Sequence, residues 1–61
     1  MNTEMYYHQV IKVTINKYSV DGELVQHFQH FKNAIKFANH LNEQWNPDRE
    51  ISKPFYAVMD V

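Results

Sequence analysis

Residues 5–18, MYYHQVIKVTINKY, alternate between apolar and polar side chains along most of their length. The apolar side carries Tyr7, Ile11, Val13 and Ile15, and the polar side carries His8, Lys12, Thr14 and Asn16. A period of two in a segment rich in β-branched residues is typical of a half-buried β-strand. We therefore predict a strand over about 5–18, which is long enough to lie at the centre of a sheet.

The dipeptide Asp21-Gly22 follows this strand and predicts a tight turn. Both residue types tolerate the positive φ angles that two-residue hairpin loops require. If this dipeptide forms the loop, Phe28 lies opposite Ile15, and Leu24 shares their face. Turn chemistry and apolar pattern then agree, so we predict a second, antiparallel strand over about 23–29.

Residues 31–45 change to a helical period, in which apolar side chains recur at spacings of three and four. The stripe consists of Phe31, Ala34, Ile35, Ala38, Leu41 and Trp45, with Phe37 at its edge. Such a stripe is typical of an amphipathic helix that covers a core. Asn46-Pro47 follows, and a residue before proline avoids the helical region, so the helix is expected to end there.

The remaining chain consists of a polar loop over 46–53 and a third strand over about 55–61, which begins after Pro54. The order is strand, strand, helix, strand. With the long first strand at the centre, we predict an α+β fold: a three-stranded antiparallel sheet of order 2-1-3 with one helix packed on one face. Residues 1–61 are expected to form a single domain.

Composition disfavours several classes of partner. The 61 residues carry a net charge of −1, so the clustered basic charge that holds nucleic acid is not expected. The longest apolar runs are too short to span a membrane, and no signal peptide is visible, so we expect a cytoplasmic protein without a membrane partner. Residue types with AT-rich codons dominate, which suggests a low-GC bacterium or its phage.

Catalytic and metal-binding patterns are not evident. The chain has no Cys, its one Gly cannot build a phosphate-binding loop, and Ser19 and Ser52 stand outside any nucleophile motif. In the expected register His8 and His27 share a face, but they lie roughly 26 Å apart at about 3.3 Å per residue. We therefore expect no catalytic residues, no metal site and no cofactor.

The candidate site is the sheet face that a single helix leaves uncovered. Because the helix is expected to cover the side of Ile11, Val13 and Ile15, the other side stays open. The candidate residues of a protein-binding face are Tyr6, His8, Val10, Lys12, Tyr18, Tyr56 and Val58. Tyrosines are favoured at interfaces, and a contiguous apolar patch marks a binding surface. The free edges of the outer strands are an alternative interface. The simplest alternative is that the uncovered face is in contact with solvent and binds no partner.

These observations favour a small non-enzymatic protein-binding module or regulator, encoded by a phage or mobile element. It is expected to act through the uncovered face on another protein or on a second copy of itself. One alternative is a single-stranded nucleic-acid binder that stacks bases on Tyr6, Tyr56 and His8 near Lys12. Another alternative is a structural subunit whose core a partner chain completes.

Overall fold

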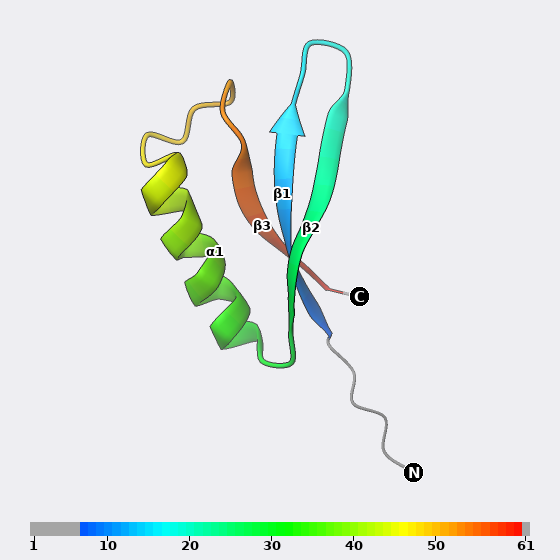
Figure 1. Ribbon diagram of the computed structural model, residues 1–61, viewed down its shortest axis with the longest axis vertical. Coiled ribbons are helices and arrows are strands. Elements are labelled where there is room, and N and C mark those ends of the chain that lie inside the picture. Colours follow the sequence, from blue (N-terminus) through cyan, green and yellow to red (C-terminus); the bar gives the residue numbers. More distant parts are fainter. Residues whose placement is uncertain (1–6, 61) are drawn as a thin grey trace.

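The computed structural model describes residues 7–60. It contains four elements in the order β1 (His8–Ile15), β2 (Val20–Phe28), α1 (Phe31–Trp45) and β3 (Phe55–Asp60). The strands form one sheet of order β2-β1-β3, in which both pairs of neighbours are antiparallel. The helix lies along one side of the sheet and packs mainly against β3 (Figure 1). The predicted α+β fold is confirmed, including its strand order.

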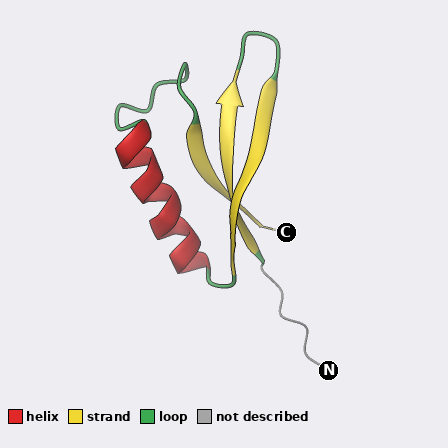
Figure 2. Cartoon of the chain, viewed as in Figure 1, coloured by secondary structure: helices red, strands yellow, loops and turns green. Residues whose placement is uncertain are grey.

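The hairpin between β1 and β2 differs from the prediction. Residues 16–19 form the connecting loop (Figure 2), and Asp21-Gly22 lies inside β2. The predicted register is therefore wrong, because Ile15 pairs with Val20 and not with Phe28. Within the described residues, β1 ends at Ile15 and not near residue 18, and β2 runs from Val20 to Phe28 and not from 23 to 29. Residues 5 and 6 of the predicted first strand lie outside the described residues.

Local hydrogen bonds explain why the loop forms at 16–19. The backbone N–H of Asn16 donates to the carbonyl of Ser19 at 2.7 Å, and Asn16 Nδ2 donates to Asp21 Oδ2 at 3.2 Å. The carboxylate of Asp21 thus serves as an acceptor for the loop instead of occupying a turn position. Gly22 has a packing role, because a Cβ there would lie only 3.2 Å from Ile11 Cγ2.

A β-bulge divides β2 into two halves. The pairs Ile11 with Leu24 and Val10 with Gln26 enclose one extra residue, Val25, on β2. Because strand side chains alternate between faces, one extra residue moves the remainder of β2 to the other face. Leu24 therefore shares a face with Ile11 as predicted, whereas Phe28 shares the opposite face with Val10.

The helix covers the side of β1 that carries Val10, so the predicted assignment of faces is reversed. Val10 is fully buried with Ala34 and Ala38, and these three are the buried hydrophobic residues of the described chain. The side chains packed around them are Phe28, Phe37, Tyr56 and Val58. The link between β2 and α1 has only two residues, so the helix begins close to Phe28. The ring of Phe28 packs against Phe37 of α1, so the helix lies on the side of the sheet to which Phe28 points. The bulge sets that side.

The helix has the bounds that its period predicts, 31–45. Ala34 and Ala38 form the centre of its covered stripe, and Phe37 contributes more than its edge position suggests, since its ring centroid lies 5.2 Å from that of Phe28. Phe31 and Trp45, at the two ends of the stripe, are more than half exposed. The covered stripe is therefore centred on the middle turns of α1.

Candidate functional site

The structure separates the residues that were predicted to form one binding face. Val10, Tyr56 and Val58 lie beneath α1, in the core or packed against it. Their assignment to an uncovered face is wrong, because a side chain with 0% exposure such as that of Val10 offers no contact to a partner. Tyr6 lies outside the described residues.

His8 and Lys12 also lie on the helix side of the sheet. His8 Nδ1 is 2.6 Å from Asp60 Oδ1, and its ring meets Phe31 edge to face with centroids 5.4 Å apart. Lys12 lies opposite Tyr56 in the sheet and lines a shallow hollow with Trp45 and other residues. Both side chains thus lie next to residues of α1 and not on an uncovered face.

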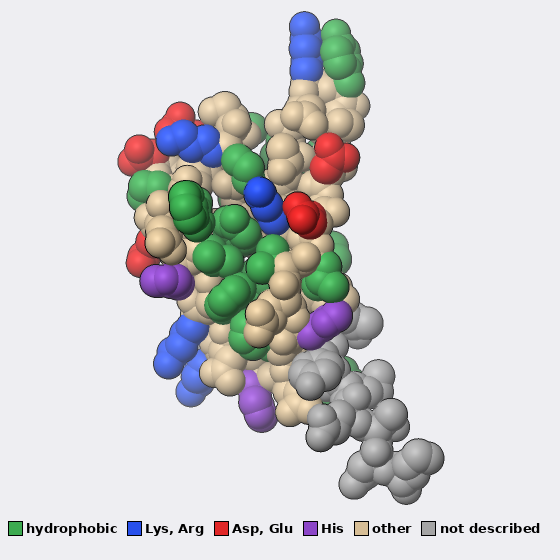
Figure 3. All heavy atoms as spheres, in the orientation of Figure 1, with side chains coloured by type: hydrophobic (Ala, Val, Ile, Leu, Met, Phe, Trp, Pro, Cys, Tyr) green, Lys and Arg blue, Asp and Glu red, His purple; other side chains and the backbone are tan. Residues whose placement is uncertain are grey.

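Tyr18 is exposed at the tip of the hairpin, away from the other candidates. Lys17 Nζ lies 5.5 Å from the centre of its ring, within the range of a cation–π contact. Figure 3 shows a basic and a hydrophobic side chain next to each other at this tip, which projects beyond α1. Tyr18 is therefore an isolated exposed aromatic residue and not one member of a patch.

The side of the sheet opposite α1 carries an apolar surface, which we call the open face. Residues directly opposite one another in antiparallel strands point to the same side, so the register assigns its members. They are Gln9, Ile11, Val13 and Ile15 from β1, Val20, Gly22, Leu24 and His27 from β2, and Phe55, Ala57 and Met59 from β3. Phe55, at the end of β3 nearest the loop over 46–54, also lines a depression beside α1. Within residues 7–60, no other element lies over this surface (Figure 1).

Large exposed apolar side chains dominate the open face. Val20 is 67% exposed, Leu24 48% and Met59 58%. None of the positions that define the face is Lys, Arg, Asp or Glu, because the charged residues of the strands point to the helix side. Its two polar side chains contact each other, with Gln9 Nε2 3.1 Å from His27 Nε2. The face is therefore mainly apolar and carries no Lys, Arg, Asp or Glu, which the sequence interpretation missed.

Both edges of the sheet are less available to a partner than the open face. On β3, the amide of Asn42 hydrogen-bonds the backbone N–H and carbonyl of Tyr56, at 2.7 and 2.8 Å. On β2, the bulge at Val25 interrupts the regular edge. Covering groups and bulges are devices that prevent the edge of a sheet from pairing with another chain.

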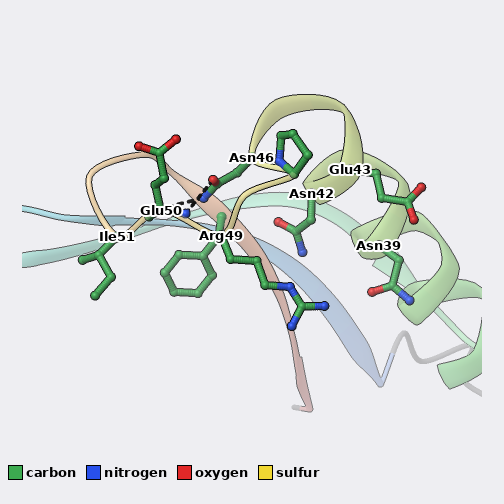
Figure 4. Close-up of a pocket in the computed structure, with 9 residues that line it drawn as sticks. Asn39, Asn42, Glu43, Asn46, Arg49, Glu50 and Ile51 are labelled. Atoms are coloured by element: carbon green, nitrogen blue, oxygen red, sulfur yellow. Dashed lines mark hydrogen bonds between the residues drawn. The ribbon is translucent and has the colours of Figure 1, made fainter.

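A depression of about 580 Å³ lies between the C-terminal half of α1 and the loop over 46–54. Figure 4 shows Asn39, Asn42 and Glu43 on its helix side, and Arg49 and Ile51 on its loop side. Its charged groups are exposed, so solvent screens them strongly. The depression offers hydrogen-bonding groups at the protein surface.

Asn46 organises the loop beside this depression. It is only 2% exposed; its Oδ1 accepts the N–H of Glu50 at 2.9 Å, and its Nδ2 donates to the carbonyl of Glu50 at 2.9 Å. The carboxylate of Glu50 pairs with Lys53 at 3.1 Å. A general acid or base has to face a substrate, whereas the carboxylate of Glu50 is paired with Lys53 of the same loop. The buried amide of Asn46 therefore has a structural role.

The histidines of the described chain do not assemble a metal site. Within residues 7–60, no group of three or more His, Asp or Glu side chains is arranged to hold a metal ion. The large separation predicted for His8 and His27 is wrong, because His27 lies opposite Gln9, the neighbour of His8 in β1. The two imidazoles nevertheless point to opposite sides of the sheet.

Known proteins show no likeness that would assign a function. No protein family, no curated protein and no solved structure matches this chain. Among residues 7–60, no helix combines the length and the apolar character needed to cross a membrane. The open face is therefore the feature on which a functional proposal rests.

Proposed function

We propose that this protein is a small binding module or regulator that acts on a protein partner through its open face and has no catalytic role. One observation carries the proposal: a mainly apolar sheet surface without Lys, Arg, Asp or Glu lies opposite the only helix of the described chain. Contiguous apolar surfaces on small domains are typical of protein–protein interaction sites.

The energetics of covering this surface support the same conclusion. Removing apolar area from water contributes about 25 cal/mol per Å², and Val20, Leu24 and Met59 each leave roughly half or more of their surface in solvent. A partner that covers them desolvates no Lys, Arg, Asp or Glu side chain of the open face, so the large cost of burying one of these charges is avoided. An apolar protein surface is therefore the favoured partner.

A single-stranded nucleic acid fits the same surface less well. Of the predicted stacking residues, Tyr56 packs against the core and His8 contacts Asp60 and Phe31. The open face offers no Lys or Arg to neutralise phosphates. A structural subunit completed by a partner chain uses the open face as well, and its distinguishing signature is an isolated chain that folds poorly.

Site-specific photo-crosslinking in cells of the source organism tests the proposal. The photo-reactive residue p-benzoylphenylalanine replaces Leu24 on the open face, and in a matched control it replaces Ile51, an apolar loop residue that is 71% exposed. We expect light-dependent protein adducts from position 24 and few from position 51, because only the open face is covered by a partner. Equal adducts at both positions, or none at position 24, would contradict the proposal.

A further inference from the structure

We propose that the partner of the open face is a second copy of this chain, packed sheet against sheet about a twofold axis. This inference rests on the proposed function, since it names the partner of the same surface. The charge distribution, the state of the sheet edges, the extent of the surface and the small core each support a self-complementary contact.

The charge distribution permits self-association. A twofold axis brings the same patch of both copies together, so residues near the axis meet their own counterparts. A charged residue there would face a like charge across a desolvated interface, which is costly. The open face carries no Lys, Arg, Asp or Glu, whereas Lys12, Glu23 and Asp60 point to the helix side. Two copies therefore meet without like-charge contacts.

The sheet edges favour stacking over the extension of one sheet into another. An edge-to-edge dimer needs a regular strand with free backbone groups on its outer side. Asn42 occupies those groups at Tyr56 on β3, and the bulge at Val25 interrupts β2. The open face has neither obstacle.

The extent of the open face is close to what a small dimer needs. The three strands have eight, nine and six residues, so at about 4.8 Å between strands and about 3.3 Å per residue they outline a surface roughly 14 Å wide and roughly 20–30 Å long. This is up to about 400 Å² in projection, and the accessible area of a surface with projecting side chains is larger. Two copies together thus approach the roughly 1,000 Å² that a specific interface requires.

The core of the single chain is small, so self-association would add to its stability. Within residues 7–60, Val10, Ala34 and Ala38 are the buried hydrophobic residues, and small chains without disulfides are often stabilised by oligomerisation. A second copy is present wherever the chain is made, whereas another protein has to be supplied at a matching concentration. Stacking would give Ile11 and Val13 the second layer that α1 gives Val10.

The relief of the open face suits interdigitation. On β3, the small Ala57 lies between Phe55 and Met59, whereas on β2 the space over Gly22 is already taken in part by Ile11 Cγ2 of the same chain. Small residues between large ones let the side chains of two sheets mesh at a spacing of about 10 Å, with strand directions within about 30° of each other. The resulting dimer has the two sheets at its centre and one helix on each outer side.

Sedimentation equilibrium of the purified chain tests the inference, with protein concentrations from about 1 μM to 1 mM. We expect a concentration-dependent rise from the monomer mass of 7.4 kDa to twice that value. In the Leu24→Asp variant we expect the dissociation constant to rise at least hundredfold, because each copy would bury an unpaired carboxylate. The Ile51→Asp variant, altered in the loop, should dimerise like the wild type.

A second variant guards against misfolding of Leu24→Asp. Val20 is 67% exposed, so its replacement by Asp disturbs little within one chain, and circular dichroism checks that the fold is retained. Isotope-filtered nuclear Overhauser spectra of a mixed labelled sample should show contacts between methyl groups of open-face residues of different copies. A dimer that survives both Leu24→Asp and Val20→Asp uses another surface, and this result would overturn the inference.

Failure of the inference and failure of the proposed function are distinguishable. A wild-type chain that stays monomeric up to 1 mM, together with crosslinks from position 24 to a protein of another mass, would refute the homodimer and support the binding module. A monomer without crosslinks from position 24 would refute both. Crosslinked products of twice the chain mass, together with a dimer that Leu24→Asp dissociates, would support both.

Discussion

The side chain of Asn42 completes the hydrogen bonding of Tyr56 on the free edge of β3. Its Oδ1 accepts the backbone N–H of Tyr56 at 2.7 Å, and its Nδ2 donates to the backbone carbonyl of Tyr56 at 2.8 Å. Both backbone groups point away from β1, so the amide occupies the position that a further strand would take. One residue of α1 thereby fixes the helix to the sheet and protects its edge.

Replacing Asn42 by Ala should destabilise the protein by about 1–2 kcal/mol. Two hydrogen bonds that each contribute about 1 kcal/mol are lost, and the better helix propensity of Ala returns about 0.5 kcal/mol. Urea denaturation at a fixed low protein concentration measures the change in the free energy of unfolding. The control is Asn39→Ala, three residues earlier on an exposed position of α1, which should be neutral or slightly stabilising. Equal destabilisation by both substitutions would contradict the role assigned to Asn42.

Replacing the buried Asn46 by Ala should cost more, about 2–4 kcal/mol. The substitution removes the bonds from the buried Asn46 amide to the N–H and the carbonyl of Glu50 in the loop after α1, although the carbonyl still accepts the N–H of Lys53. The same denaturation experiment measures the loss. Asp48→Ala, an exposed change in the same loop, should stay within about 0.5 kcal/mol of the wild type. An Asn46 variant as stable as the Asp48 variant would show that the loop does not depend on the buried amide.

Arg49 has a positive φ of 56°, which places it in the left-handed region. This conformation costs an L-residue about 1–2 kcal/mol, whereas glycine adopts it freely and loses somewhat more backbone entropy on folding. Arg49→Gly should therefore stabilise the protein by about 0.5–1 kcal/mol, and Arg49→Val should destabilise it by about 1 kcal/mol because of its branched Cβ. Thermal unfolding of the two variants checks the opposite signs. A loss of stability in Arg49→Gly would mean that the guanidinium makes a contribution larger than the backbone strain.

The element types and their order were predictable because local patterns determine them. The three- and four-residue spacing from Phe31 to Trp45 and the proline at position 47 define the helix with its observed bounds. The alternation around Val13 predicts β1, and its length places it in the middle of the sheet. These signals depend on neighbours in sequence and not on the tertiary packing.

The face covered by α1 was not predictable from the same signals. The pattern in β1 alone favours the side of Ile11, Val13 and Ile15, and the Asp21-Gly22 dipeptide suggests a turn that does not form. The bulge at Val25 reverses the side to which Phe28 points. The sequence around it, Leu24-Val25-Gln26, contains no glycine or proline that would indicate a bulge. A one-residue insertion inside a strand is set by cross-strand pairing, so it leaves little trace in the sequence.

The candidate site was missed for the same reason, although one signal pointed to it. His8 and Lys12 in β1 and Asp60 in β3 all fall on the side of Val10, which leaves the other side of both strands without charge. Counting the charged residues on each face would have identified the uncharged face as a surface suited to association. The sequence interpretation instead gave more weight to exposed tyrosines.

The reversal of faces makes a direct comparison of Val10 and Val13 informative. Val→Thr keeps the shape of the side chain but adds a hydroxyl, which costs about 1–3 kcal/mol where it is buried without a partner. Val10→Thr should lose this amount, because Val10 has 0% exposure beneath α1. Val13→Thr should lose less than about 1 kcal/mol in urea denaturation of dilute protein, since Val13 lies on the open face and is only partly buried. If the proposed dimer forms, raising the protein concentration should increase the cost of Val13→Thr and leave that of Val10→Thr unchanged. A larger loss for Val13 than for Val10 in dilute protein would show that α1 covers the opposite side of the sheet.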